Sequence, residues 1–242
     1  MTTSTYNGNY DCDVIVIGGG SVGVCSAYFL AEAGKRVMVV DEHDICAGAS
    51  YGNGGLACPS HSVPLAAPGV IWQGLKWMFS PDSPFYIKPR LDLGLLSWLW
   101  KFRSACNDSQ RDLAMPYIRD VSLRSIEFFQ DFAAMDDMDF GYEKKGALGL
   151  FKTEKGLMEG VHEACLLRDI GIEAQVIGPL EIQKYLGGLR TTAKGGVFYP
   201  EDAHMVPADF VRGLAKKIEV MGGNVLRFAK VLGFVTQERN II

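Results

Sequence analysis

The stretch from Val14 to Asp41 most constrains what this chain can fold into. It opens with four apolar residues, VIVI, a run typical of a buried strand, and continues directly into GGGSVG. Apolar residues at helical spacing follow as far as Gly34, and a second apolar run over residues 37–40 ends on Asp41. A strand, a glycine-rich turn, a helix, a strand and an acid in this order form the dinucleotide-binding fingerprint.

Each glycine of the turn has a physical role. Gly18 permits the tight turn, Gly20 lets the backbone approach a pyrophosphate, and Gly23 lets the helix pack closely on the strand. The phosphates then face the positive end of the helix, where Ser21 and Val22 have N–H groups without a helical partner. A glycine-rich turn in some other α/β protein is the alternative, but the complete context favours a bound dinucleotide.

The segment after the second strand predicts further contacts with the cofactor. Asp41 can accept hydrogen bonds from the ribose hydroxyls, and Glu42 follows it at the same strand end. The loop that follows is long and rich in glycine, as a backbone lying against a ligand must be. The expected contacts in this loop are Ser50 and Asn53 with phosphate or ribitol oxygens, and the N–H groups of Gly54, Gly55 and Leu56 with a flavin ring. A mobile surface loop is the alternative interpretation.

Charge and composition exclude several classes of protein. The 242 residues carry a net charge of −4, so no basic field is available for nucleic acid. We expect neither a signal peptide nor a membrane-spanning helix, since no run approaches about 20 apolar residues. The six cysteines and four histidines are scattered, which favours free thiols in the cytoplasm and no metal site.

The remaining elements are predicted from periodicity and turn signals. Residues 140–152 are predicted to form a hairpin, and Pro116 is predicted to mark the first turn of a long helix. The predicted helices span 71–79, 91–102, 109–135, 154–169, 179–186 and 207–221, and the predicted strands 147–151, 172–176, 195–199, 224–228 and 231–237. Ile241 and Ile242 look like the start of a further strand, so we expect a cut chain.

The tryptophan-rich helices between residues 71 and 102 allow two interpretations. Tryptophan is well suited to the headgroup depth of a membrane, so these helices could be an interfacial anchor. Packing on the protein core is the alternative. Basic residues are few in this region, which favours core packing.

Several motifs together resemble one enzyme family. They are VIVIGGGSVG with VMVVD, then ASYGNGGL, VPLAAPGV and LKWM, and finally FVRGLAKKIEVMGGNVLRF. With these motifs the chain resembles the FAD-dependent D-amino-acid dehydrogenase and oxidase family, in particular the dehydrogenase branch, over nearly all of residues 11–242. The first motif is shared by many flavoproteins, and the loop motifs are more specific.

The resemblance implies an α/β fold with a Rossmann-like FAD-binding domain, interleaved with an α+β substrate domain built on an antiparallel sheet. Residues 1–80 would be the first FAD-binding segment, 81–195 the substrate-domain segment, and 196–242 an incomplete return to the FAD domain. The glycines of the turn would hold the FAD pyrophosphate, and the backbone of Val231 would touch the adenine. Family members continue well past residue 242, so the C-terminal part of both domains would be missing here.

The chemistry implied is hydride transfer from the Cα of a D-amino acid to flavin N5, followed by hydrolysis of the imine to a 2-oxo acid and ammonia. Electrons would pass to a quinone or another respiratory acceptor, with a peripheral contact at the inner face of the membrane. Because the flavin carries the difficult step, no catalytic residue is assigned. Polar residues at predicted loop ends are expected to have ordinary structural roles: Cys58, His61, Tyr199, Asp202 and His204.

Two other functions stay open at this point. One is a related oxidase that uses oxygen, of the glycine or sarcosine type. The other is a non-catalytic nucleotide-binding fragment that needs a partner chain, or the missing C-terminal part, to complete its fold. The substrate pocket would separate these alternatives, and its residues are not recognised in this sequence.

Overall fold

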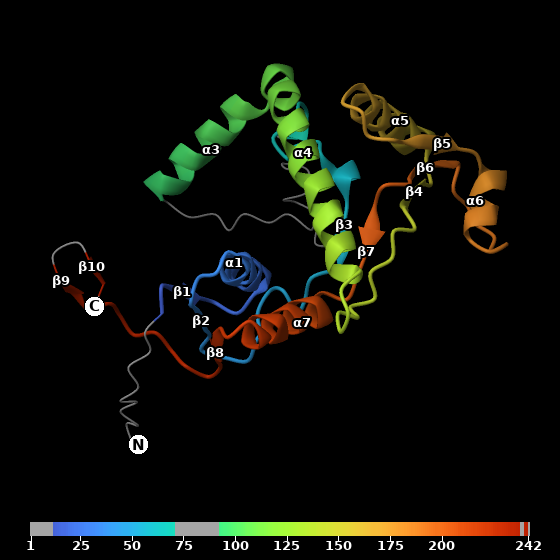
Figure 1. Cartoon of the computed structure of the whole chain (residues 1–242). Coiled ribbons are helices and arrows are strands. Elements are labelled where there is room, and N and C mark those ends of the chain that lie inside the picture. Colours follow the sequence, from blue (N-terminus) through green and yellow to red (C-terminus); the bar gives the residue numbers. More distant parts are fainter. Residues whose placement is uncertain (1–11, 71–91, 238–239, 242) are drawn as a thin grey trace. The chain divides into compact units, whose positions relative to one another are not determined.

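The computed structural model describes residues 12–70, 92–237 and 240–241. The chain divides into two compact units that are interleaved in sequence (Figure 1). The first unit comprises Met1–Gly55, Gln130–Tyr142 and Met205–Ile242, and the second comprises Leu56–Phe129 and Glu143–His204. The mixed α/β architecture with interleaved units is the predicted one.

The first unit is built on a parallel sheet with the strand order β1–β2–β8. Its strands are β1 (Val14–Ile17), β2 (Val37–Val40) and β8 (Asn224–Leu226), with Val14 opposite Val37 and Met38 opposite Asn224. All four residues of the central strand β2 are buried. On β1, by contrast, Ile15 and Ile17 are 54% and 52% exposed.

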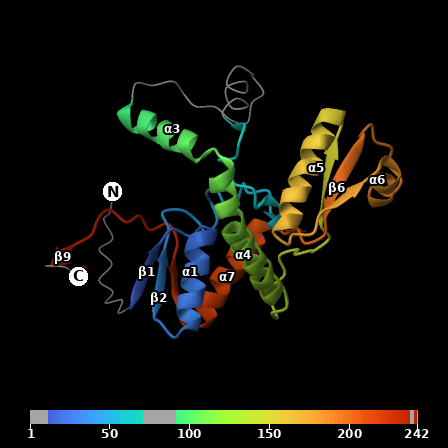
Figure 2. The same cartoon turned by 90° about the horizontal axis from the view of Figure 1, so that it is seen from above.

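Two helices pack against each other beside this sheet (Figure 2). Helix α1 (Ser21–Glu32) follows the glycine-rich turn and ends before Gly34, whose φ of +77° is the left-handed conformation that terminates many helices. Helix α7 (Pro207–Val220) buries an apolar stripe that includes Phe210, Leu214 and Ile218. Both helices were predicted within one or two residues of their observed bounds.

Aromatic side chains join the three sequence segments of the first unit. Phe132 and Phe140 come from the middle segment, and their ring centroids lie 5.5 and 5.1 Å from that of Phe210 on α7. The ring of Tyr28 on α1 stands edge-on to Phe132 at 5.3 Å. Such contacts combine apolar burial with favourable ring geometry, so they hold residues 130–142 to the first unit.

The second unit contains an antiparallel sheet with the strand order β4–β6–β5. Its strands are β4 (Ala147–Phe151), β6 (Gly195–Tyr199) and β5 (Gln175–Ile177), with Ala147 opposite Tyr199 and Gln175 opposite Phe198. Helix α5 (Glu154–Asp169) packs Ala164 against Val197, while α6 (Pro179–Tyr185) packs Ile182 against the next residue of β6, Phe198. Since successive side chains of a strand point to opposite faces, the two helices cover the two faces of this sheet.

The remaining elements are short strands and two longer helices. They are β3 (Leu56–Ala57), the 3-10 helix Pro59–His61, α3 (Leu93–Ala105), α4 (Asp108–Ala133), β7 (Ala203–His204), β9 (Thr236–Gln237) and β10 (Asn240–Ile241). β3 pairs with β7, and β9 with β10, both antiparallel. Among the residues described, no helix has the length and hydropathy that crossing a membrane requires.

Three local predictions were wrong. The hairpin over 140–152 does not form, because β4 pairs with β6, about fifty residues further on, rather than with the residues before it. The expected strand over 231–237 is reduced to Thr236–Gln237, and Leu232 is 91% exposed. Pro116 lies inside α4, so the helix continues through a residue that cannot donate a backbone hydrogen bond.

The prediction of core packing holds only in part for α3, since none of its residues is fully buried while Leu95, Leu99 and Phe102 are half-buried. The predicted strands over 172–176 and 224–228 are observed as the shorter β5 and β8, shifted or trimmed by a few residues. The predicted helix over 71–79 lies outside the described residues.

Candidate functional site

The turn between β1 and α1 requires glycines, because a side chain would be strained at one position and would clash with the backbone at another. Gly18 has a φ of +113°, a conformation that L side chains rarely adopt. A Cβ on Gly23 would lie 2.0 Å from the carbonyl oxygen of Gly18, so α1 can approach β1 this closely because residue 23 has no side chain. The turn therefore fits the close backbone approach to a pyrophosphate that the fingerprint requires.

The start of α1 presents backbone donors beside this turn. Gly20 is the N-cap, and its carbonyl accepts the first helical hydrogen bond from the N–H of Val24. The N–H groups of Ser21, Val22 and Gly23 precede that bond, so they have no partner within the helix. Val22 is 80% exposed. Helix N–H groups and the helix dipole together favour an anion at this position.

Ser50, from the glycine-rich loop, lies against the same helix start. The N–H of Ser21 donates to Ser50 Oγ at 3.0 Å, and Ser50 Oγ donates to Ser21 Oγ at 3.3 Å. A Cβ on Gly20 would lie 3.1 Å from Ser50 Oγ. The loop thus contributes a hydroxyl to the region where the phosphates are expected.

Asp41 is held at the carboxyl end of β2 by two backbone donors. Its Oδ2 accepts from the N–H of Gly19 at 2.6 Å, and its Oδ1 accepts from the N–H of His43 at 2.7 Å. An ionised carboxylate can accept about four hydrogen bonds, so capacity for a pair of hydroxyl groups remains. The two bonds fix the orientation of this acid relative to the glycine turn.

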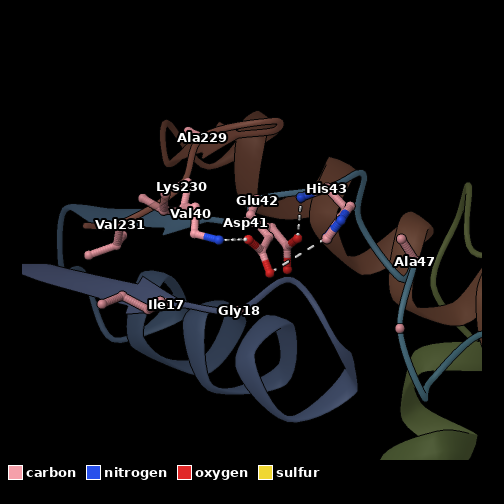
Figure 3. A pocket seen from close by; sticks show the side chains of 11 residues that line it. Ile17, Gly18, Val40, Asp41, Glu42, His43, Ala47, Ala229, Lys230 and Val231 are labelled. Atoms are coloured by element: carbon pink, nitrogen blue, oxygen red, sulfur yellow. Dashed lines mark hydrogen bonds and ion pairs between the residues drawn. The ribbon is translucent and has the colours of Figure 1, made fainter. Parts of the chain in front are cut away.

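A pocket of about 480 Å³ lies beside Asp41, at the carboxyl ends of the three parallel strands (Figure 3). This edge of a parallel sheet is where such folds bind their ligands, and the volume is within the usual range for small-molecule sites. Its lining residues are Ile17, Gly18, Val40, Asp41, Glu42, His43, Ala47, Gly48, Ala229, Lys230 and Val231.

An ion pair crosses one side of this pocket (Figure 3). Lys230 Nζ lies 2.9 Å from Glu42 Oε2, with the two side chains 69% and 48% exposed. The Lys230 ammonium lowers the pKa of the Glu42 carboxyl, and Glu42 raises the pKa of Lys230. The backbone joins the same two segments, since the N–H of Ala229 donates to the carbonyl of Asp41 at 2.8 Å.

The predicted site residues fall into three groups. Gly18, Asp41, Glu42 and Val231 line the pocket, and Gly20, Ser21, Val22, Gly23 and Ser50 surround the start of α1. Asn53, Gly54, Gly55 and Leu56 do not line the pocket.

Residues 53–56 have a local structure of their own. The side chain of Asn53 accepts from the N–H of Gly55 at 2.8 Å, and a Cβ on Gly54 would meet no atom within 4 Å. Gly55 has a φ of +71°, and its carbonyl accepts from the N–H of Met205. Leu56, which is 63% exposed, begins β3 in the second unit.

In the second unit, a buried carboxylate organises a polar cluster. Asp202 is 2% exposed and accepts from the N–H and the Oγ of Ser60, at 3.0 and 2.5 Å. Burial, together with the nearby charge of Asp202, raises the pKa of the Cys58 thiol to about 12. Burial likewise raises the pKa of Tyr199 to about 12. Both groups are therefore protonated at neutral pH.

Comparison with known proteins decides the family. The family model described as FAD dependent oxidoreductase matches residues 13–241. The chain belongs to this family. The glycine turn, the helix start and the pocket beside Asp41 are thus features of an FAD-dependent oxidoreductase fold, and FAD is the cofactor of the family.

The relatives of this FAD-dependent oxidoreductase include curated bacterial enzymes. A D-amino acid dehydrogenase of Neisseria meningitidis serogroup A is 32% identical over 194 residues, covering 78% of this chain and 46% of that relative. A D-amino acid dehydrogenase of Helicobacter pylori is 28% identical over 222 residues, covering 92% of this chain and 53% of that relative. The chain spans about half the length of the curated relatives it matches.

Solved structures show the same fold. Glycine oxidase from Geobacillus kaustophilus superposes with a TM-score of 0.65 at 18% identity, over 93% of this chain and 48% of that one. At this identity the similarity concerns the fold alone.

Sequence reasoning missed part of the pocket of this family member. Ala47 and Gly48 belong to the glycine-rich loop, whose composition is the signal that could have included them. No local sequence pattern marks Lys230, because its ion-pair partner Glu42 lies in a distant segment of the chain. His43 follows Asp41 by two residues, and its backbone N–H donates a hydrogen bond to the Asp41 carboxylate.

Proposed function

We propose that this protein is a D-amino-acid dehydrogenase that uses FAD. The observation that carries the proposal is 32% identity to a curated D-amino acid dehydrogenase over 78% of the chain, joined to a glycine turn and a pocket that fit a dinucleotide. Since the chain spans about half of such relatives, the activity refers to the whole protein that contains it.

The residues of the first unit would hold the ADP half of FAD. The N–H groups at the start of α1, with Ser50, would bind the pyrophosphate, and Asp41 would accept hydrogen bonds from the adenosine ribose. The backbone of Val231 would lie against the adenine. Asn53, Gly54, Gly55 and Leu56 would lie toward the isoalloxazine, and residues 81–195 would belong to the substrate domain.

When bound, FAD supplies an acceptor for the hydride of the amino-acid Cα. The amine loses a proton as the Cα–N bond becomes an imine, and water hydrolyses this imine to a 2-oxo acid and ammonia. The protein's part is to orient the substrate and to exclude competing reactions. We further propose that a quinone takes the electrons, which implies peripheral contact with the inner face of the cytoplasmic membrane.

Anaerobic reduction of bound flavin tests the proposal. The whole protein that contains this chain, loaded with FAD, is mixed with D-alanine or with L-alanine, and the visible flavin absorption is followed before and after addition of a soluble quinone or of oxygen. We expect bleaching by D-alanine and recovery with the quinone. Bleaching by L-alanine alone would contradict the assigned stereochemistry, and recovery with oxygen but not with quinone would contradict the dehydrogenase.

A variant at Asp41 tests the cofactor site itself. Asp41→Asn keeps the size of the side chain but removes the charge that accepts the ribose hydroxyls, so FAD should bind at least tenfold more weakly by isothermal titration. Asp44→Asn, on the same loop but outside the pocket lining, is the matched control. Equal affinity of the two variants would contradict the assigned role of Asp41.

A further inference from the structure

Helix α3 is capped at its start and is only partly covered by the rest of the chain, with Leu95, Leu99 and Phe102 half-buried. The side chain of Asp92 accepts from the N–H of Leu95 at 3.1 Å, which satisfies one of the free donors at the helix start. None of the 13 residues from Leu93 to Ala105 is buried. Among the elements described, α3 makes no extensive contact with another helix or strand. A helix this apolar and this exposed is unusual in a globular protein.

The exposed apolar side chains of α3 form a stripe. Leu93, Leu96 and Trp100 are 85%, 53% and 73% exposed. Their spacing of three and then four residues places them on one face of the helix. Trp98, nearby in sequence, stacks on Phe102 with ring centroids 5.2 Å apart and is itself 47% exposed.

The charges on α3 have one sign. Lys101 and Arg103 are exposed, and the helix carries no acidic side chain between Leu93 and Ala105. The chain as a whole has a net charge of −4, so the positive charge of this helix is opposite in sign to that of the chain. An exposed apolar stripe, two tryptophans and basic residues are the features of a helix that lies in an anionic lipid interface.

Helix α4 provides an internal comparison. It also exposes an apolar stripe, with Leu113, Tyr117 and Val121 at 59%, 68% and 69%. The charge of α4 differs, however, because this helix carries five acidic and three basic side chains, with Asp112 and Asp120 paired to Arg111 and Arg119. An anionic surface would therefore repel the negative net charge of α4 and attract the positive net charge of α3, so charge distinguishes the two stripes.

We propose that α3 is a membrane-docking helix that binds an anionic bilayer. Leu93, Leu96 and Trp100 would enter the boundary between headgroups and acyl chains, and Lys101 and Arg103 would contact lipid phosphates. At about 1.5 Å per residue the helix is roughly 20 Å long, which is shorter than a hydrocarbon core of about 30 Å, so it lies along the surface. This inference extends the proposed peripheral membrane contact and rests on it.

Vesicle flotation tests the docking surface. The chain is mixed with vesicles of phosphatidylcholine, either alone or with phosphatidylglycerol, and the protein in the floating fraction is measured. We expect binding to the anionic vesicles, weakened at least fivefold in high salt and in the charge variant Lys101→Gln/Arg103→Gln. The triple variant Leu93→Ser/Leu96→Ser/Trp100→Ser should lose binding.

The matched control is the α4 triple variant Leu113→Ser/Tyr117→Ser/Val121→Ser, which removes a similar stripe and should float with the vesicles as the unchanged chain does. Quenching of tryptophan fluorescence by brominated lipids reports on depth, and it should fall in Trp98→Phe/Trp100→Phe. This second readout keeps the test valid if a serine variant fails to fold.

Three outcomes would overturn the proposal. They are the absence of flotation with anionic vesicles, equal loss of flotation in the α3 and α4 variants, and concentration-dependent self-association removed by the α3 variant, which would make the helix a protein interface. FAD affinity is measured on the same samples. A chain that binds FAD but no vesicle refutes α3 docking alone, whereas a chain that binds vesicles but no FAD refutes the proposed cofactor site alone.

Discussion

At the scale of single residues, Gly23 shows how the absence of one methyl group determines the cofactor turn. A Cβ at this position would meet the backbone carbonyl of Gly18 at 2.0 Å, and a backbone atom cannot rotate away as a side chain can. We therefore expect Gly23→Ala to reduce the free energy of unfolding by about 1–3 kcal/mol, the usual cost of overpacking.

Urea denaturation measures the effect of Gly23→Ala. Gly48→Ala is the control, because a Cβ on Gly48 meets no atom within 4 Å. A Gly23→Ala midpoint equal to that of the control would show that α1 and β1 can separate at no cost, contrary to the close packing described here.

Cys58 provides a prediction about pH. Its pKa is raised from 9.0 to about 12, first by burial and then by the charge of Asp202. The folded protein therefore keeps the thiol neutral where the unfolded chain ionises it. The resulting contribution to stability is complete below pH 9 and is lost as the pH rises from 9 to 12.

Alkylation by iodoacetamide, read by mass spectrometry near pH 9, checks the state of this thiol, because the thiolate is the reactive form. Cys58 should react much more slowly than the exposed Cys165. Asp202→Asn should accelerate the reaction, whereas Ser60→Ala, which keeps the charge of Asp202, should accelerate it less. Rapid labelling of Cys58 in the unchanged protein would disprove the raised pKa.

At the scale of elements, α7 contributes six buried residues to the first unit, whereas α1 contributes three. Leu214 is fully buried in its apolar stripe, so Leu214→Ala should lower the free energy of unfolding by about 2–5 kcal/mol through lost contacts and a residual cavity. Val220, at the exposed end of the same helix, is 83% exposed. Val220→Ala should change the free energy of unfolding by less than about 0.5 kcal/mol.

Thermal or urea unfolding of the two α7 variants gives the comparison. If Leu214→Ala is no less stable than Val220→Ala, then α7 does not contribute to the core of the first unit as its burial indicates.

Local elements could be predicted from the sequence, while their pairing could not. Strand β4 was predicted at its observed bounds, because the apolar run ALGLF is a local signal. The predicted pairing of β4 was wrong, since the hairpin rule favours neighbours in sequence. The observed partner β6 lies beyond two intervening helices. The segment 231–237 has the composition of a strand, but composition does not provide a neighbour to pair with.

The same distinction applies to the candidate site. The sequence motif predicts four of the site residues, because a single strand–turn–helix–strand unit fixes their spacing. They are Gly18, Gly20, Gly23 and Asp41. The motif does not predict Lys230, because ion pairs between distant segments leave no periodic signal. The exposure of α3 was equally unpredictable, since an apolar helix pattern is the same whether the helix faces a protein core or another apolar phase.

At the scale of the whole molecule, the pocket predicts which ligands stabilise the chain. It is assembled around the expected positions of adenosine and pyrophosphate, so ADP should raise the melting temperature as FAD does, while FMN should not. A ligand present at about 100 times its Kd contributes about 2.7 kcal/mol of stability through linkage. Differential scanning fluorimetry makes the comparison, and protection by FMN without protection by ADP would place the cofactor elsewhere.

The pocket also sets an order of events during protein synthesis. The residues of one wall of the pocket have all been synthesised once Gly48 is added. The other wall is formed by Ala229, Lys230 and Val231. At about 5–20 residues per second, translation separates the two walls by roughly 10–40 s. During that interval the glycine turn has been synthesised but the segment that closes the pocket has not. All residues of the second unit are synthesised within the same interval. In the proposed site, tight FAD capture therefore waits for residues 229–231, and the second unit has the opportunity to fold first.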